Sequence, residues 1–145
     1  MALNAKSFKL IEAQIVQSQR MRFMLAKLYG AAIEVEMRGF LLQANEEEMA
    51  CWTDIQKAFY ATKGDNLRLK KLAEKASLEY QVLAAFEEGR TFAYNLPAEQ
   101  VAEEGVALRE SKNPYRSDET MPEEVKRAWT AGFQNAFEVI SGESW

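Results

Sequence analysis

Hydrophobic positions in the first third of the chain recur at helical steps. From residue 7 to about residue 44 they come three and four residues apart, which is the spacing of one helix face and not the alternation of a strand. The pattern weakens between Ile15 and Phe23, and two glycines within the stretch each disfavour helix by about 1 kcal/mol relative to alanine. We expect one long first helix, or two helices in line, that begins at Asn4 or Ser7 and extends to about Ala44.

Start and stop signals predict the next two helices. Asn45 is a preferred cap, Glu48 three residues later completes a capping-box pattern, and acidic residues occupy the first turn. A helix therefore begins after Asn45 and ends at Gly64. The following apolar series predicts a second helix from about residue 66 to residue 89 or 94.

Two shorter helices follow a proline boundary. Leu96-Pro97 interrupts the helical pattern, because the residue before proline disfavours helix and proline suits a first turn. We expect a helix over 98–110, a polar loop, and a last helix over 122–140 that is capped by Thr120. No stretch alternates as a half-buried strand would. The predicted fold is all-α, with an N-terminal helical bundle at 1–95 and a small helical pair at 96–145.

Composition narrows the function without identifying it. The chain has 145 residues, and 48% of them are hydrophobic, which suits a packed core. The formal net charge is -4, with twelve Lys/Arg against ten Asp/Glu in residues 1–83 and six against twelve in residues 84–145. A protein that grips nucleic acid phosphates usually has a basic excess, so nucleic acid is not the favoured partner.

Candidate chemistry is sparse. The chain has no histidine, which removes the usual general base and metal ligand, and its one cysteine, Cys51, cannot form an internal disulfide. We therefore expect no catalytic residue, no metal and no cofactor. Neither a signal peptide nor a run of eighteen apolar residues is present, so we expect a cytoplasmic protein that does not enter a membrane.

The last predicted helix combines bulky and small residues on one side. Trp129 and Phe133 lie on the same face as Gly132, so the face has projecting rings beside a notch for a neighbouring helix. Gly105 on the preceding helix is small enough to accept those rings. The Pro114-Tyr115 pair would cover the end of the two helices.

This region, from about residue 99 to residue 138, resembles the ribosome modulation factor family. The elements that carry the resemblance are Gly105-Val106-Ala107, Asn113-Pro114-Tyr115, and Trp129 to Ala136 with Gly132-Phe133 at its centre. The resemblance implies a compact helical pair and a bacterial or phage origin. In the family's best-known member the pair binds ribosomal RNA and promotes ribosome dimerisation. That member is strongly basic, whereas this segment is acidic, so we carry over the fold and the origin only.

Three groups of residues are candidates for binding or for the motif. The candidates for partner binding are acidic residues of the last two helices and a methionine-rich part of the first, which could equally fill the core: Glu103, Glu104, Glu123, Glu124, Met21, Met24 and Phe23. The candidates for RNA binding form a basic cluster that is also typical of a solvated helix face: Lys63, Arg68, Lys70, Lys71 and Lys75. The motif residues with a structural role are Gly105, Pro114, Tyr115, Trp129, Gly132 and Phe133.

The sequence favours a non-catalytic regulatory protein that acts through protein–protein contact on a large host assembly. One hypothesis is that the acidic C-terminal helices inhibit a nucleic-acid-handling or defence complex. The alternative is a ribosome- or RNA-associated factor that uses the Lys63–Lys75 face. A homo-oligomer is left open.

Overall fold

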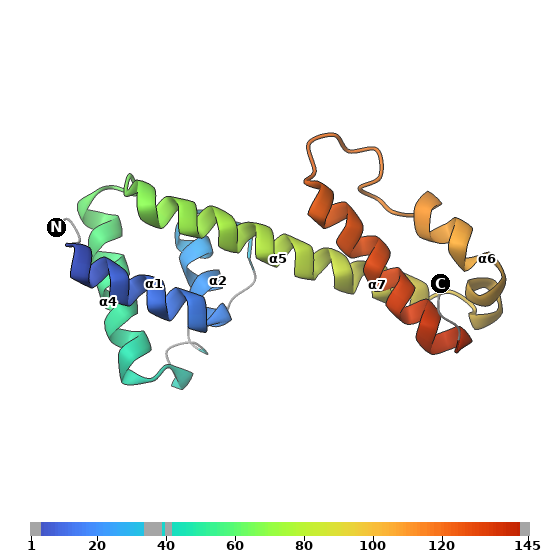
Figure 1. Ribbon diagram of the computed structural model, residues 1–145, viewed down its shortest axis with the longest axis horizontal. Coiled ribbons are helices and arrows are strands. Elements are labelled where there is room, and N and C mark those ends of the chain that lie inside the picture. Colours follow the sequence, from blue (N-terminus) through green and yellow to red (C-terminus); the bar gives the residue numbers. More distant parts are fainter. Residues whose placement is uncertain (1–3, 34–38, 40–41, 143–145) are drawn as a thin grey trace. The chain divides into compact units, whose positions relative to one another are not determined.

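The computed structural model describes residues 4–33, 39 and 42–142, and these residues form helices and no strand (Figure 1). The prediction of an all-α fold is confirmed. The chain divides into two compact units, residues 1–77 (unit 1) and residues 78–145 (unit 2). The helices are α1 (Ala5–Gln17), α2 (Gln19–Leu28), α4 (Glu46–Ala61), α5 (Leu67–Tyr94), α6 (Ala98–Ser111) and α7 (Glu123–Ser141).

Of the two alternatives predicted for the first stretch, one long helix is wrong: the chain forms two helices, α1 and α2, and leaves the helical conformation at Ser18. Asn4 caps α1 as expected, with its Oδ1 accepting from the backbone N–H of Ser7 at 2.8 Å. Ser18 has an extended backbone, and its hydroxyl oxygen accepts from the N–H of Met21 at 3.1 Å, so it caps the start of α2. Arg22 donates to the carbonyl oxygens of Ile15 and Val16, near the C-terminal end of α1. The helix that follows ends at Leu28, and residues 34–38, 40 and 41 of the predicted span lie outside the described residues.

A buried carboxylate joins α4 to the corner between α1 and α2. The capping box of Asn45 and Glu48 is present as predicted, with the Asn45 side chain accepting from the Glu48 N–H at 2.7 Å. Glu48 is buried, and its carboxylate accepts from the Asn45 N–H at 3.3 Å and from the Ser18 hydroxyl at 3.2 Å. Arg20 lies 3.6 Å from the same carboxylate. These partners compensate the desolvation of a charged group that would otherwise be costly to bury.

The core of unit 1 lies between α1, α2, α4 and the first turns of α5. Both α1 and α2 contact α4, and each contributes its apolar stripe. The Arg68 guanidinium of α5 lies over the Phe8 ring, 3.6 Å from its centroid, and pairs with Glu12 at 3.6 Å. The buried core residues are Phe8, Ile11, Ile15, Met21, Met24, Leu25, Cys51, Trp52, Ile55, Ala58, Leu69 and Ala73.

Unit 2 is built where the backbones of α5 and α7 come close together. A Cβ atom added to Gly89 of α5 would overlap the carbonyl oxygen of Trp129, and one added to Gly132 of α7 would overlap the carbonyl oxygen of Phe86. Only glycine allows backbones to approach so closely. Gly132 therefore forms a notch for a neighbouring helix, as predicted. That neighbour is α5, whereas the sequence suggested Gly105 of α6.

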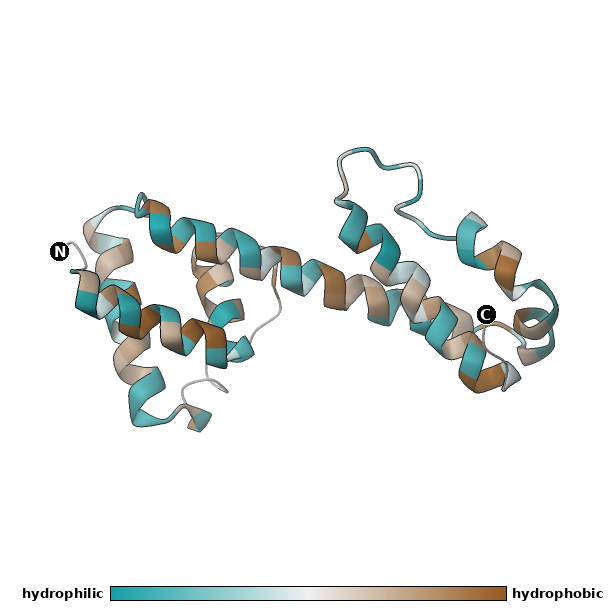
Figure 2. Ribbon diagram, viewed as in Figure 1, coloured by the Kyte–Doolittle hydropathy of each residue, from teal (hydrophilic) through white to brown (hydrophobic). Residues whose placement is uncertain are grey.

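Aromatic rings surround this close approach. Trp129 and Phe133 of α7 are fully buried and stack with centroids 5.7 Å apart, and Phe92 of α5 lies 5.6 Å from Trp129. On the other flank α6 packs against α7 and buries Val101 and Gly105. Along α7 hydrophobic and hydrophilic residues alternate in short segments, as expected for a helix with one buried face (Figure 2).

Two predicted boundaries differ from the structure. The units divide between Ser77 and Leu78, within α5, whereas the sequence predicted a boundary between residues 95 and 96. The reason is the packing of residues 78–94 of α5 against α7. In addition, α7 begins at Glu123 after Pro122 without a side-chain cap, because the Thr120 hydroxyl donates to Asp118 at 2.6 Å instead. The end of α7 at Gly142, which has φ +70°, agrees with the prediction.

Replacing Gly132 by alanine tests the close approach of α5 and α7. In an ordinary helix this change stabilises by up to about 1 kcal/mol. Here the added methyl meets the backbone of Phe86, so we expect the free energy of unfolding to fall by at least about 2 kcal/mol. Urea unfolding followed by circular dichroism measures the change. The exposed neighbour Ala131, changed to glycine, is the matched control and should lose about 1 kcal/mol. A Gly132→Ala protein as stable as the parent would contradict the packing.

Candidate functional site

The Asn113-Pro114-Tyr115 segment connects α6 to α7 and is held in place by its first residue. The Asn113 side-chain amide donates to the Lys126 carbonyl oxygen at 2.9 Å and to the Thr130 hydroxyl at 3.2 Å. Its Oδ1 accepts from the Tyr115 backbone N–H at 2.9 Å, as in an Asx turn. The asparagine therefore binds the loop to the first two turns of α7, while Pro114 remains exposed.

Tyr115 joins the same loop to α5. Its ring packs against the core of unit 2, and its hydroxyl donates to the Glu88 carboxylate at 2.6 Å. This hydrogen bond, then burial of the phenol and the charge of Glu88, raise the pKa of Tyr115 to about 12. The phenol therefore remains a donor throughout the neutral range. Among the predicted motif residues, Tyr115 thus has a clear structural role alongside the buried Gly105, Trp129, Gly132 and Phe133.

The four predicted acidic residues are all exposed but do not form one cluster. Glu103 and Glu104 lie in the middle of α6, and Glu123 and Glu124 lie in the first turn of α7. Glu123 lines a cavity together with Glu110, near the end of α6. Glu103 precedes Glu110 by seven residues, which is about 10 Å along the helix axis. The four predicted glutamates therefore form two acidic surfaces, with Glu103 and Glu104 on α6 and Glu123 and Glu124 at the start of α7.

Of the two interpretations of the methionine-rich stretch, core filling holds for Met21 and Met24, and a partner-binding surface formed by these two residues is wrong. Met21 and Met24 have exposed fractions of 0% and 1% and belong to the core of unit 1, while Phe23 is half-buried. The helical spacing that suggested a groove is also the spacing of a core stripe, and here the core interpretation holds. Met21 and Met24 are therefore not available to a partner in this conformation.

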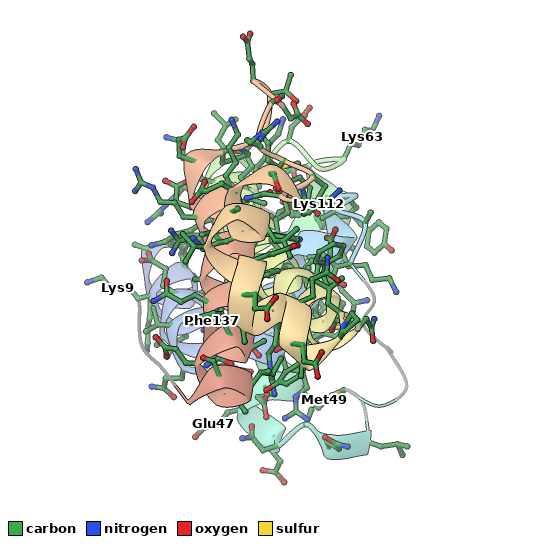
Figure 3. The ribbon with its side chains drawn as sticks, turned by 90° about the vertical axis from the view of Figure 1, so that its right-hand side faces the viewer. Lys9, Glu47, Met49, Lys63, Lys112 and Phe137 are labelled. Atoms are coloured by element: carbon green, nitrogen blue, oxygen red, sulfur yellow. The ribbon has the colours of Figure 1, made fainter. Side chains whose placement is uncertain are left out.

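The predicted basic residues are exposed but face different ways. Arg68, Lys71 and Lys75 lie within about 60° of one another around α5, since each residue turns the helix by about 100°. Lys70 lies about 100° from Lys71 and lines a separate cavity with Tyr29 and Glu74. Lys63 precedes the helix and points into solvent (Figure 3). Arg68 is already engaged by Phe8 and Glu12.

The described residues offer little chemistry. Cys51 is buried, and burial, then the charges of Asp54 and Glu48, raise its pKa to about 12, so it stays a thiol at neutral pH. Within the described ranges, no group of three or more His, Cys, Asp or Glu side chains could hold a metal ion. No helix in that part of the chain has both the length and the apolar character needed to cross a membrane.

Sequence reasoning missed a cavity of about 390 Å³ beside the Asn113 loop. It is lined by charged and polar side chains from the end of α6, from the loop and from one side of α7: Glu110, Arg116, Glu123, Lys126, Arg127, Thr130, Ala131 and Gln134. On α7 the lining residues recur at three- and four-residue steps, and this spacing could have shown from the sequence that they share one side of the helix. Arg116 gives no such signal, because only the fold of the loop brings it to this face.

No protein-family model, no curated protein and no solved structure matches this chain.

Replacing Tyr115 by phenylalanine tests the bond between the loop and α5. The variant loses the hydrogen bond to Glu88, so we expect the free energy of unfolding at neutral pH to fall by about 1 kcal/mol. The pKa of the phenol is 10.0 without its surroundings and about 12 in the folded chain, so the folded state holds this proton more tightly. The contribution is therefore complete below pH 10 and is lost between pH 10 and pH 12.

Urea unfolding of parent and variant, at neutral pH and through that alkaline window, measures both effects. Tyr94→Phe is the control, because the exposed Tyr94 makes a ring contact with Arg90 that phenylalanine retains. Equal stability of the parent and Tyr115→Phe proteins at neutral pH would refute the role of this bond, as would a difference that persists undiminished above the window.

Proposed function

We propose that this protein is a non-catalytic binding protein of bacterial or phage origin that regulates a large host assembly by protein–protein contact. The observation that carries the proposal is the exposed acidic surface of α6. Four of the fourteen residues of α6 are glutamates, and its one basic side chain, Arg109, lies 3.4 Å from Glu110. The excess of negative charge is therefore not neutralised within the helix.

Three of the four glutamates of α6 form a line along the helix. Glu99, Glu103 and Glu110 lie within about 40° of one another around the axis and extend over about 16 Å. Val106 lies between them on the same side and is 55% exposed. An apolar side chain surrounded by charged ones is typical of a protein-binding surface, where the centre excludes water and the rim gives specificity.

A basic surface on the partner is the complement of such a line. Assemblies that handle nucleic acid have channels rich in Lys and Arg, and a rigid helix with regularly spaced carboxylates can compete with phosphates for those side chains. This is the basis for proposing that the protein inhibits a nucleic-acid-handling or defence complex. The resemblance to the ribosome modulation factor family agrees with a bacterial setting and with a rigid helical unit.

Neutralising the α6 glutamates tests this proposal. In affinity purification from bacterial lysate with the tagged full chain, we expect one discrete protein complex to be retained at low and at moderate salt. The double variant Glu103→Gln and Glu104→Gln should retain much less of it, because the charge pairing is lost while the helix is kept. A second double variant, Glu123→Gln and Glu124→Gln, tests the surface at the start of α7 separately, with circular dichroism to verify folding.

The matched control removes two charges from unit 1, with Asp54→Asn and Glu74→Gln, which are exposed on α4 and α5. Retention of the complex should be unchanged in this control. If the α6 and α7 variants retain the complex as well as the parent does, the acidic-surface proposal is refuted.

The second candidate function is a ribosome- or RNA-associated factor that uses Lys71 and Lys75, which are exposed on one side of α5. This function predicts that the protein sediments with ribosomes, and that binding falls steeply with added salt as counterions compete for the phosphates. The variant Lys71→Gln and Lys75→Gln should weaken such sedimentation. If sedimentation with ribosomes is lost in the variant Glu103→Gln and Glu104→Gln instead, the first proposal is favoured.

A further inference from the structure

We infer that the cavity beside the Asn113 loop is a binding site for a phosphate monoester, the group carried by mononucleotides and other small phosphorylated molecules. The first observation is the distribution of cations in unit 2. Residues 78–145 contain six Lys/Arg against thirteen Asp/Glu, yet three of the six, Arg116, Lys126 and Arg127, line this one cavity. The least basic part of the chain thus concentrates half of its cations at one place.

The acidic side chains of the cavity are already paired. Glu123 lies 3.5 Å from the Lys126 ammonium, and Glu110 lies 3.4 Å from Arg109. In the described part of the chain, neither Arg116 nor Arg127 has a carboxylate within salt-bridge distance, and both side chains are exposed. Two guanidinium groups are therefore available to an anion, and they are the uncompensated charges at this site.

The Asn113 loop fixes one wall of the cavity in place. Asn113 binds the loop that carries Arg116 to the α7 turns that carry Lys126 and Thr130. Tyr115 binds the other side of the loop to Glu88 of α5. Because both ends of the Asn113–Tyr115 segment are tied to helices, the two arginines are presented from fixed backbones, which reduces the entropy lost when a ligand binds.

The charge count favours a monoester over the phosphodiester of a nucleic acid strand. A monoester carries close to two negative charges at neutral pH and three terminal oxygens that accept hydrogen bonds. It therefore matches two unpaired guanidinium groups, each of which can donate two parallel hydrogen bonds. An internal phosphodiester has a single charge and two such oxygens. The volume of about 390 Å³ also suits a small phosphorylated molecule.

NMR titration of the ¹⁵N-labelled full chain in a buffer without phosphate tests the site. The probes are inorganic phosphate, uridine 5′-monophosphate, and a short oligouridylate without a terminal phosphate. We expect uridine 5′-monophosphate to cause saturable shifts in residues 113–118 and in the first three turns of α7. Its Kd should be at least about tenfold lower than that of the oligouridylate, counted per phosphate.

Single substitutions locate the site. Arg116→Gln and Arg127→Gln should each raise the Kd for uridine 5′-monophosphate about fivefold or more, because each removes a charge-assisted pair. The matched control is Lys112→Gln, which removes one exposed cation next to the loop (labelled in Figure 3). Lys112 is not among the residues that line the cavity. That variant should stay within about twofold of the parent.

Three outcomes would overturn the inference. One is the absence of saturable shifts with either monophosphate probe, and another is an equal loss of binding in Arg127→Gln and Lys112→Gln, which would indicate attraction by diffuse charge. The third is tighter binding of the oligouridylate, which would assign the cavity to a nucleic acid backbone. The site shares only Glu110 with the proposed α6 surface. The α6 variant Glu103→Gln and Glu104→Gln keeps every lining residue and should therefore bind the monophosphate like the parent.

Discussion

The close approach of two backbones at Gly89 and Gly132 is the constraint on which unit 2 depends. Because neither position has a side chain, α5 and α7 can approach until each backbone meets the carbonyl group of the other helix. Trp129 and Phe133 then fill the space beside that approach, and α6 covers the other flank of α7. The loop from Asn113 to Tyr115 is anchored to both helices, through Asn113 on α7 and through Tyr115 on α5.

Unit 1 is organised by a different kind of interaction. Its helices meet around an apolar core, but their corner is determined by the buried carboxylate of Glu48, which is bonded to the caps of both α2 and α4. A buried charge tolerates few alternative arrangements, because any that leaves it unpaired is costly. Ser18, where the chain leaves the helix between α1 and α2, both caps α2 and donates to this carboxylate. Polar contacts thus set the path of the chain, while apolar burial supplies most of the stability.

Local signals predicted much of the fold, and contacts between distant residues account for the rest. The helices α4, α5, α6 and α7 were predictable from periodicity and from breakers such as Pro97, because these effects act within a few residues. The weakened pattern between Ile15 and Phe23 allowed for two helices, but it did not give the position of the break at Ser18, whose hydroxyl is bonded to Glu48, thirty residues away. The pairing of Gly132 with Gly89 was missed for the same reason, as a glycine notch does not reveal which helix enters it. For the site, exposure of the α6 glutamates followed from the pattern, but burial of Met21 and the position of Arg116 required the tertiary structure.

The arrangement of charge in unit 2 allows two surfaces of opposite sign to act separately. Exposed charges are screened over about 8 Å at physiological ionic strength. Glu103 is separated from the cavity residue Glu110 by about 10 Å along α6, which exceeds that length. The arginines of the cavity therefore experience mainly their immediate neighbours, whose carboxylates are paired with Lys126 and Arg109. A net acidic unit can consequently present Glu99 and Glu103 of α6 to a basic partner and still hold an anion at the loop, because Glu110, which lies at the cavity, is paired with Arg109.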